Sequence, residues 1–267
     1  MRFLLLLNLA GKIAAVLVFA QSAGSAVAFW FLPDALLAYH MFVPRAQGLV
    51  RVHRRFSTRE REVWLTIDDG PDPEDTPQLL ELLAQHGARA TFFVIGENVR
   101  RHPDLVRAMV AAGHEVAHHT QTHPLGDFWC ASPARVGREL DECLAALREV
   151  GVKPTRFRTP AGLKNLWLGN ELRKRSLTCI GWTARGLETR KRHPDEVVAR
   201  LTRHVVPGAI LLTHEGPRVP QPIRVAAIRG LLEFLREHRY RCVIPDPGQL
   251  AREPVVIIGG AAGIRAA

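Results

Sequence analysis

Two adjacent aspartates, Asp68 and Asp69, follow a short apolar run at residues 63–67. Two like charges side by side repel each other, and each loses hydration where the site is partly covered. The stretch DDGPDP, residues 68–73, is also rich in residues that form turns. The aspartate pair therefore indicates either a plain turn or a site whose partners elsewhere in the chain neutralise or use the carboxylates.

Histidines that could partner these carboxylates occur in HHTQTH, residues 118–123. His119 and His123 are four residues apart, so on a helical turn both imidazoles would face the same way and suit a divalent metal. Two histidines and one aspartate make a three-ligand site that leaves positions for water and substrate. Adjacent residues on an extended chain point in different directions, so the second aspartate stays available as a base.

The chain after residue 62 alternates short apolar runs with segments of helical spacing. Seven runs are interpreted as buried parallel strands, at 63–67, 90–94, 115–119, 155–160, 177–182, 209–214 and 240–244. Three glycines, Gly87, Gly113 and Gly151, stand where the intervening helices should end. The alternation predicts one α/β domain.

Polar residues at the ends of strands meet at one rim in parallel α/β folds. Four of the predicted strands carry such residues at or just beyond their carboxyl ends. We therefore expect one shared site that contains Asp68, Asp69, His118, His119, His123, Arg158 and His214.

The composition of the 267-residue chain is basic, with a formal net charge of +10 and a pI of about 10.3. Such a balance favours anionic partners, of which membrane headgroups and nucleic acid are the usual ones. The sequence contains no helix-turn-helix, zinc-finger or RNA-binding pattern, so no nucleic-acid partner is expected. The four cysteines form no CxxC pair, which favours free thiols and a reducing compartment.

The N-terminus holds two apolar stretches, residues 3–20 and 23–43, each about long enough to span a bilayer. Residues 26–28, AVA, resemble a signal-peptidase site, but Lys12 and the apolar residues after the site argue against cleavage. Six arginines follow within residues 45–61 and should stay on the cytoplasmic side. We expect a hairpin or re-entrant anchor in a bacterial inner membrane, with membrane lipid as a partner and a cytoplasmic catalytic domain. A single uncleaved anchor with a periplasmic domain is the alternative.

Four motifs resemble those of the polysaccharide deacetylases, carbohydrate esterase family four, in order and spacing: TIDDG (66–70), HTQTH (119–123), RTPAG (158–162) and LLTH (211–214). The resemblance to this family's NodB homology domain implies a distorted (β/α) barrel of about seven strands. It also implies hydrolysis of an N-acetyl group on an amino sugar. The expected organisation is a membrane anchor at 1–45, a basic linker at 46–61, the deacetylase domain at 62–250 and a tail at 251–267.

The resemblance also assigns roles by motif position. It implies that Asp69, His119 and His123 hold a divalent metal, usually zinc in this family. It implies that Asp68 is the catalytic base and that His214 is the general acid that protonates the leaving amine.

The remaining residues that the resemblance implies support the chemistry. Arg158 would orient Asp68, and Pro160 and Ala161 would line the groove, with the backbone N–H of Ala161 at the oxyanion. Trp182 completes the expected substrate-binding set.

The segment GWTARGLET, residues 181–189, departs from the family pattern. Thr183 and Arg185 stand where acids are common, so the residue that tunes His214 is open, and Glu188 is a candidate. Ala161 stands where an aromatic residue is frequent, which points to a different substrate shape. A further set of cations could meet an anionic group, such as the phosphate of a lipid-linked sugar, or form only a solvated rim: Lys164, Arg185 and Arg190.

The expected function is a metal-dependent deacetylase that acts on an N-acetylated polysaccharide or lipid-linked saccharide. Removal of a formyl group, O-deacetylation, and saccharide binding without catalysis on the same fold are the alternatives. The sugar, its linkage, the native metal and the oligomeric state are left open by the sequence.

Overall fold

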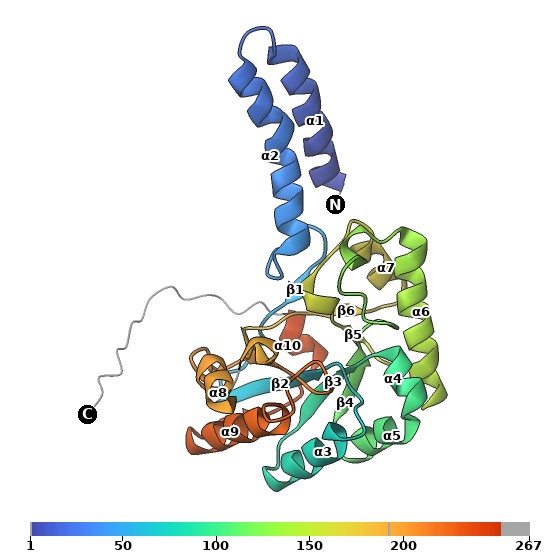
Figure 1. Cartoon of the computed structure of the whole chain (residues 1–267), viewed down its shortest axis with the longest axis vertical. Helices are drawn as coiled ribbons and strands as arrows, with labels where there is room; N and C mark the ends of the chain where they lie inside the picture. The colour runs from blue at the N-terminus through green and yellow to red at the C-terminus, as the bar shows by residue number, and fades with distance from the viewer. Residues whose placement is uncertain (1, 192, 252–267) are drawn as a thin grey trace, which may run out of the picture.

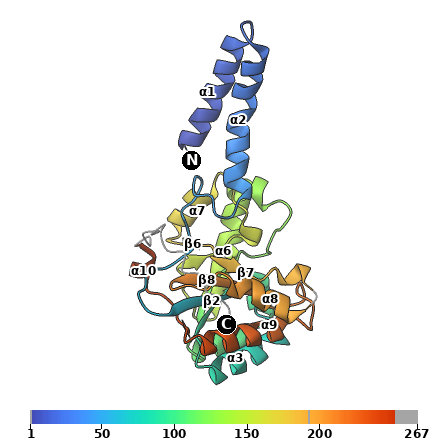
Figure 2. The ribbon, with the colours of Figure 1, turned by 90° about the vertical axis from the view of Figure 1, so that its left-hand side faces the viewer.

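A computed structural model describes residues 2–191 and 193–251 of the chain. A hairpin of two helices, α1 (Arg2–Val18) and α2 (Ala23–Phe42), stands off a rounded α/β domain, and both ends of the hairpin lie on the side of that domain (Figures 1 and 2). The predicted tail at 251–267 falls outside the described residues except for Ala251.

Nine parallel strands form one sheet in the described part of the chain, in the order β1-β6-β5-β4-β3-β2-β8-β7, with β9 also paired to β2. Their bounds are β1 (Val52–His53), β2 (Glu62–Asp68), β3 (Ala90–Val94), β4 (Glu115–His118), β5 (Arg156–Phe157), β6 (Thr178–Ile180), β7 (Ala184–Arg185), β8 (Ala209–His214) and β9 (Arg241–Cys242). Only residues 181–183 separate β6 from β7, although these strands lie near opposite ends of the order. The sheet must therefore curl back on itself, and the predicted distorted (β/α) barrel is confirmed.

All seven predicted strands are present, and β1 and β7 are additional. Both additional strands are two residues long, which is too short to show a periodicity in the sequence. The segment 46–61, predicted as a basic linker, contributes β1, which pairs with β6, and the buried Phe56. This segment is therefore built into the barrel.

Helices cover the outside of the sheet: α3 (Asp75–Gln85), α4 (Gly96–Arg101), α5 (Pro103–Ala111), α6 (Pro133–Glu149), α7 (Leu168–Lys174), α8 (Pro194–Thr202) and α9 (Arg224–Glu237). The short helix α10 (Pro247–Ala251) instead places Leu250 in the cluster that contains Trp64 and Phe93. The predicted stops Gly87, Gly113 and Gly151 lie two residues after α3, α5 and α6. Their φ angles are +57°, +81° and +81°, in the left-handed region that glycine adopts at low cost.

Strand β2 places its side chains alternately on the two faces of the sheet. Val63, Leu65 and Ile67 join the core beneath the outer helices, whereas Trp64 packs in a second cluster with Phe93. Asp68 is in phase with Trp64, so the alternation turns it toward the interior of the barrel. Because both faces are buried, the sequence of this strand shows a continuous apolar run.

The hairpin brings together the polar residues that interrupt its two apolar stretches. Lys12 forms an ion pair with Asp34, and Asn8 donates a hydrogen bond to the same carboxylate. Large apolar side chains are exposed on both helices, among them Phe3, Leu6, Leu17, Phe31 and Leu32. Helix α2 is long and apolar enough to cross a membrane, and α1 is a shorter apolar helix.

Candidate metal and active site

A cleft of about 340 Å³ opens at the carboxyl ends of the strands. The predicted residues that line it are Asp68, Asp69, His119, His123, Ala161, Trp182 and His214. The strand ends converge because β2 and β8 are paired in register, with Asp68 opposite His214. Residues from four separate motifs of the sequence therefore share one hollow.

Asp69, His119 and His123 form a compact group in which one ligand atom of each lies within 4.8 Å of the others. The Oδ1 atom of Asp69 is 3.5 Å from Nε2 of His119 and 3.3 Å from Nε2 of His123. This oxygen is buried and has no hydrogen-bond partner among residues 2–191 and 193–251. Buried polar atoms are normally paired, and a carboxylate with two imidazoles suits zinc or a similar divalent cation. The three side chains therefore fit a metal.

The second nitrogen of His119 fixes the orientation of its ring. Nδ1 lies 2.9 Å from the carbonyl oxygen of Arg158, so it must donate a proton to that oxygen. In the neutral ring the lone pair is then on Nε2, which faces Asp69. A backbone carbonyl is one of the usual partners for the second nitrogen of a metal-bound histidine.

The two histidines are not on a helical turn, so that part of the prediction is wrong. Strand β4 ends at His118, and residues 119–123 form a loop in which Thr120 and His123 have positive φ angles. The buried carboxylate of Glu139 on α6 accepts hydrogen bonds from the backbone N–H groups of Gln121 and Thr122. This anchored loop turns both imidazoles toward Asp69.

The charges of the cluster suit a metal site. Burial alone would raise the pKa of Asp69, but the neighbouring imidazoles of His119 and His123 lower it overall. Burial, assisted by His119, lowers the pKa of His123 to about 3. Asp69 is therefore a carboxylate and His123 a neutral imidazole at neutral pH, which are the forms that bind metals.

His118, which we expected at the same rim, is excluded from the cleft. Its ring is fully buried beside Phe157, and its Nε2 lies 2.9 Å from the carbonyl oxygen of Leu140 on α6. Neighbouring side chains on a strand point to opposite faces. His119 therefore reaches the cleft, and His118 serves the packing of α6.

Asp68 is held by Arg158, and both side chains are buried. Nη1 of Arg158 donates to Oδ1 of Asp68 at 2.6 Å and to the hydroxyl of Thr66 at 2.8 Å. Nε and Nη2 of the same guanidinium donate to the carbonyl oxygens of Ile180 and Gly181. This network fixes one oxygen of Asp68 and leaves the other, Oδ2, 3.6 Å from His119.

Glu188 is the partner of His214 that the altered 181–189 segment left open. Its Oε2 lies 3.1 Å from Nδ1 of His214, and its side chain is buried. Gly186 makes room for it, because a Cβ at that position would lie 2.8 Å from the Glu188 carboxyl group. Burial opposes a charge on His214, but Glu188, with Asp68 and Asp69, outweighs this effect and raises its pKa to about 9.

The other predicted residues take different positions. Ala161 lines the cleft with a φ of +52°, and Pro160 is buried beside it in a short 3₁₀ turn. Trp182 forms another wall.

Of the three cations that could meet an anion, Arg185 and Arg190 line the cleft. Lys164 does not, because its ammonium group is turned to the carbonyl oxygens of Val43 and Pro44.

Arg218 is a cleft residue that sequence reasoning missed. It lies in the loop after β8 and contacts Nδ1 of His123 through Nη1. No motif or periodicity marks it, because its position depends only on how that loop crosses the cleft.

Three comparisons place this chain among known proteins. The family model described as polysaccharide deacetylase matches residues 56–180. A chitooligosaccharide deacetylase of Bradyrhizobium sp. (strain ANU 289) is 40% identical over 161 residues, which cover 58% of this chain and 71% of the relative. A peptidoglycan-N-acetylglucosamine deacetylase of Bacillus cereus is 30% identical over 186 residues, which cover 69% of this chain and 86% of the relative.

A solved structure agrees with these relatives. The family 4 carbohydrate esterase from Streptomyces lividans, in complex with acetate, matches with a TM-score of 0.63 and 31% identity, covering 70% of this chain and 94% of that one. The chain therefore belongs to the polysaccharide deacetylase family, as its four motifs predicted. It is a hydrolase that acts on carbon–nitrogen bonds of amides, and the expectation of an enzyme is confirmed.

Proposed function

We propose that this protein is a membrane-anchored, metal-dependent deacetylase that removes the N-acetyl group from an amino sugar of a saccharide. The observation that carries the proposal is the cluster of Asp69, His119 and His123, which shares one cleft with Asp68 and His214. The names of the relatives support the same reaction, since they are deacetylases of chitooligosaccharides and of peptidoglycan N-acetylglucosamine.

Asp69, His119 and His123 would hold the metal, for which zinc is the best match to one carboxylate and two imidazoles. A bound divalent cation polarises an amide carbonyl and increases the acidity of water. The unpartnered oxygen of Asp69 and the neutral form of His123 support this assignment.

Asp68 is the proposed base. Arg158 holds its Oδ1, so its Oδ2 stays directed toward the metal cluster, where it can take a proton from the attacking water. Arg158 acts as a positioning residue, because its nitrogens donate hydrogen bonds to Asp68, Thr66 and two backbone carbonyls.

His214 is the proposed acid. An amine is a poor leaving group unless it receives a proton as the carbon–nitrogen bond breaks, and His214 is kept protonated by Glu188. General acids and bases each contribute about 10² to 10⁴ in rate. The backbone N–H of Ala161, at the wall of the cleft, is the proposed donor to the oxyanion.

The N-terminal hairpin is the proposed membrane anchor. The exposed apolar side chains of α1 and α2 support insertion of the hairpin into a bacterial inner membrane. Arginines dominate the segment that follows the hairpin, and no charged residue lies between the two helices. This asymmetry favours a cytoplasmic domain.

An assay of the purified full-length protein with zinc tests the reaction. Incubation with N-acetylglucosamine oligomers should release acetate, and Asp68→Asn should slow the release by about 10² to 10⁴. N-formylated and O-acetylated sugars in parallel identify the acyl group. Release of formate or of an O-acetyl group alone would assign one of those alternatives, and release of nothing would reject the proposed function.

A further inference from the structure

The foot of the hairpin, residues 41–45, is docked beside the cleft. Nζ of Lys164 donates to the carbonyl oxygens of Val43 and Pro44 at 2.8 and 3.1 Å, and its backbone N–H donates to the oxygen of Met41 at 3.0 Å. Gly162 has a φ of +74°, and a Cβ there would lie 2.8 Å from Pro44 and 2.7 Å from Trp182. The hairpin therefore sits in close contact with the loop that lines the cleft.

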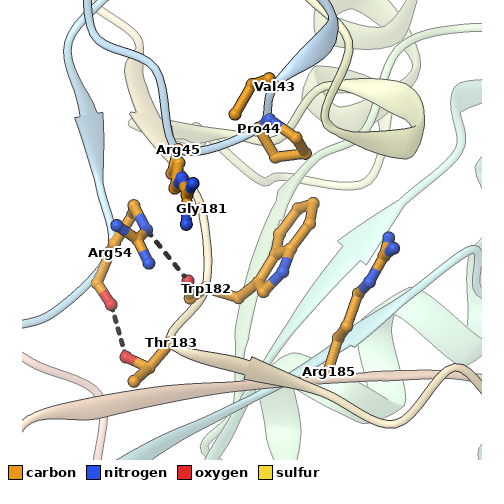
Figure 3. Close-up of a pocket in the computed structure, with 8 residues that line it drawn as sticks. All are labelled: Val43, Pro44, Arg45, Arg54, Gly181, Trp182, Thr183 and Arg185. Carbon is orange, nitrogen blue, oxygen red and sulfur yellow. Dashed lines mark hydrogen bonds between the residues drawn. The ribbon is translucent and has the colours of Figure 1, made fainter.

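A hollow of about 270 Å³ lies between this foot and the barrel. We call it the arginine pocket, and its lining residues are Val43, Pro44, Arg45, Arg54, Gly181, Trp182, Thr183 and Arg185. In Figure 3, Arg45 and Arg54 lie on one side of the Trp182 indole and Arg185 lies on the other. Trp182 and Arg185 also line the cleft, so the pocket and the cleft share a wall.

The arginine pocket carries positive charge, and no carboxylate is among its lining residues, although Glu188 of the neighbouring cleft acts on Arg185. Within residues 2–191 and 193–251, no carboxylate forms an ion pair with Arg45, Arg54 or Arg185. Burial lowers the pKa of Arg54, and the charges of Arg45 and Arg55 lower it further. Like charges that are crowded together and partly desolvated are stabilised by a bound anion. Guanidinium groups bind the oxygens of phosphate through paired hydrogen bonds.

The position of the arginine pocket favours a phosphate that belongs to a lipid-linked ligand. Its residues Val43, Pro44 and Arg45 directly follow α2, the helix that is long enough to cross a membrane. The pocket therefore lies where the apolar hairpin meets the barrel, and the cleft begins at its Trp182 wall. An apolar tail, a phosphate and a sugar in that order would match the hairpin, the pocket and the cleft.

We propose that the arginine pocket binds the phosphate of a lipid-linked saccharide and so places the sugar in the cleft. This inference rests on the proposed function only for the sugar that enters the cleft. Binding of the phosphate in the arginine pocket does not depend on that function, because it requires no turnover.

Two matched probes test the pocket with the full-length protein in neutral detergent micelles. The first is N-acetylglucosamine joined to farnesol through a phosphate, and the second is the same sugar joined to farnesol without it. Calorimetry should show that the phosphate tightens binding about tenfold or more. Arg54→Gln and Arg185→Gln should remove that gain, and Arg54→Lys should keep part of it.

Arg59→Gln is the matched control, because it removes an exposed arginine of the same basic segment that does not line the pocket. It should leave the tenfold difference unchanged. Equal affinity for the two probes, or an equal loss in the control, would overturn the proposal. Competition by phosphatidylglycerol at the affinity of the phosphate probe would overturn it too, by assigning the pocket to bulk headgroups.

Acetate release from the same probes separates this inference from the proposed function. Phosphate-dependent binding without acetate release supports the pocket and rejects the deacetylase. Acetate release with the same KM for both probes supports the deacetylase and rejects the pocket.

Discussion

The carboxylate of Glu188 lies 3.1 Å from Nδ1 of His214, although the two residues are 26 positions apart in the chain. Glu188 thus occupies the role that we could not assign from the sequence, and it does so from a 3₁₀ turn that follows β7. The contact with Glu188 orients the ring of His214 and raises its pKa, so that the imidazole stays protonated.

The first prediction concerns the pH dependence of the reaction. The pKa of His214 is raised to about 9, so the protonated acid is present below that pH and is lost as the pH rises through it. Glu188→Gln removes the charge that raises the pKa. The alkaline limb of the kcat/KM profile should therefore move by one unit or more to lower pH, since one pKa unit corresponds to about 1.4 kcal/mol.

Glu233→Gln is the control for this profile, because Glu233 is exposed on α9. It should leave the alkaline limb in place. An unchanged limb in Glu188→Gln would contradict the role of the pair.

The second prediction concerns the base. Asp68→Asn keeps the shape of the side chain but cannot accept a proton. We expect kcat to fall by about 10² to 10⁴ while zinc stays bound, because Asp68 is not in the ligand cluster. Assays of acetate release measure kcat, and zinc analysis of the same sample measures the bound metal. Asp104→Asn, at an exposed position on α5, is the control, and full activity of Asp68→Asn would assign the base elsewhere.

The third prediction concerns the metal. A chelator should abolish activity, and added zinc should restore it. Zinc should raise the melting temperature of the wild type, because a ligand that binds only the folded state stabilises it. His119→Ala should lose both effects, and His204→Ala, at an exposed position outside the cleft, should keep them. A zinc-dependent shift of equal size in His119→Ala would refute the ligand assignment.

The fourth prediction concerns stability. Arg158→Met leaves the buried carboxylate of Asp68 without its cation, which should lower the free energy of unfolding by about 3 to 5 kcal/mol. The double variant Asp68→Asn, Arg158→Met should recover part of this loss, because no buried charge is then left unpaired. Urea unfolding of the wild type and the three variants gives the coupling energy. If the losses of unfolding free energy in the two single variants simply add up in the double variant, Asp68 and Arg158 do not interact.

The fifth prediction concerns topology. The ends of the hairpin lie together, so the turn at residues 19–22 should lie across the membrane from the barrel. Alkaline phosphatase, which is active only outside the cytoplasm, should be active when fused within this turn and inactive when fused after Arg61. An active fusion after Arg61 would instead place the domain in the periplasm.

The sequence by itself determined seven of the nine described strands and the family of this protein. Runs of apolar residues, helical spacing and the three glycines at helix ends act through neighbours in the chain, so they can be recognised without coordinates. The four motifs were recognisable for a similar reason, since each is a short segment at the end of one strand.

Only the tertiary structure decided which side chains meet. His118 and His119 are adjacent, yet His118 at the end of β4 packs against α6, whereas His119, the first residue of the loop that follows, joins the metal cluster. Glu188 reaches His214, and Lys164 reaches the hairpin rather than an anion, because the curled sheet brings distant segments together. Contacts of this kind depend on the path of the whole chain, and no local pattern encodes them.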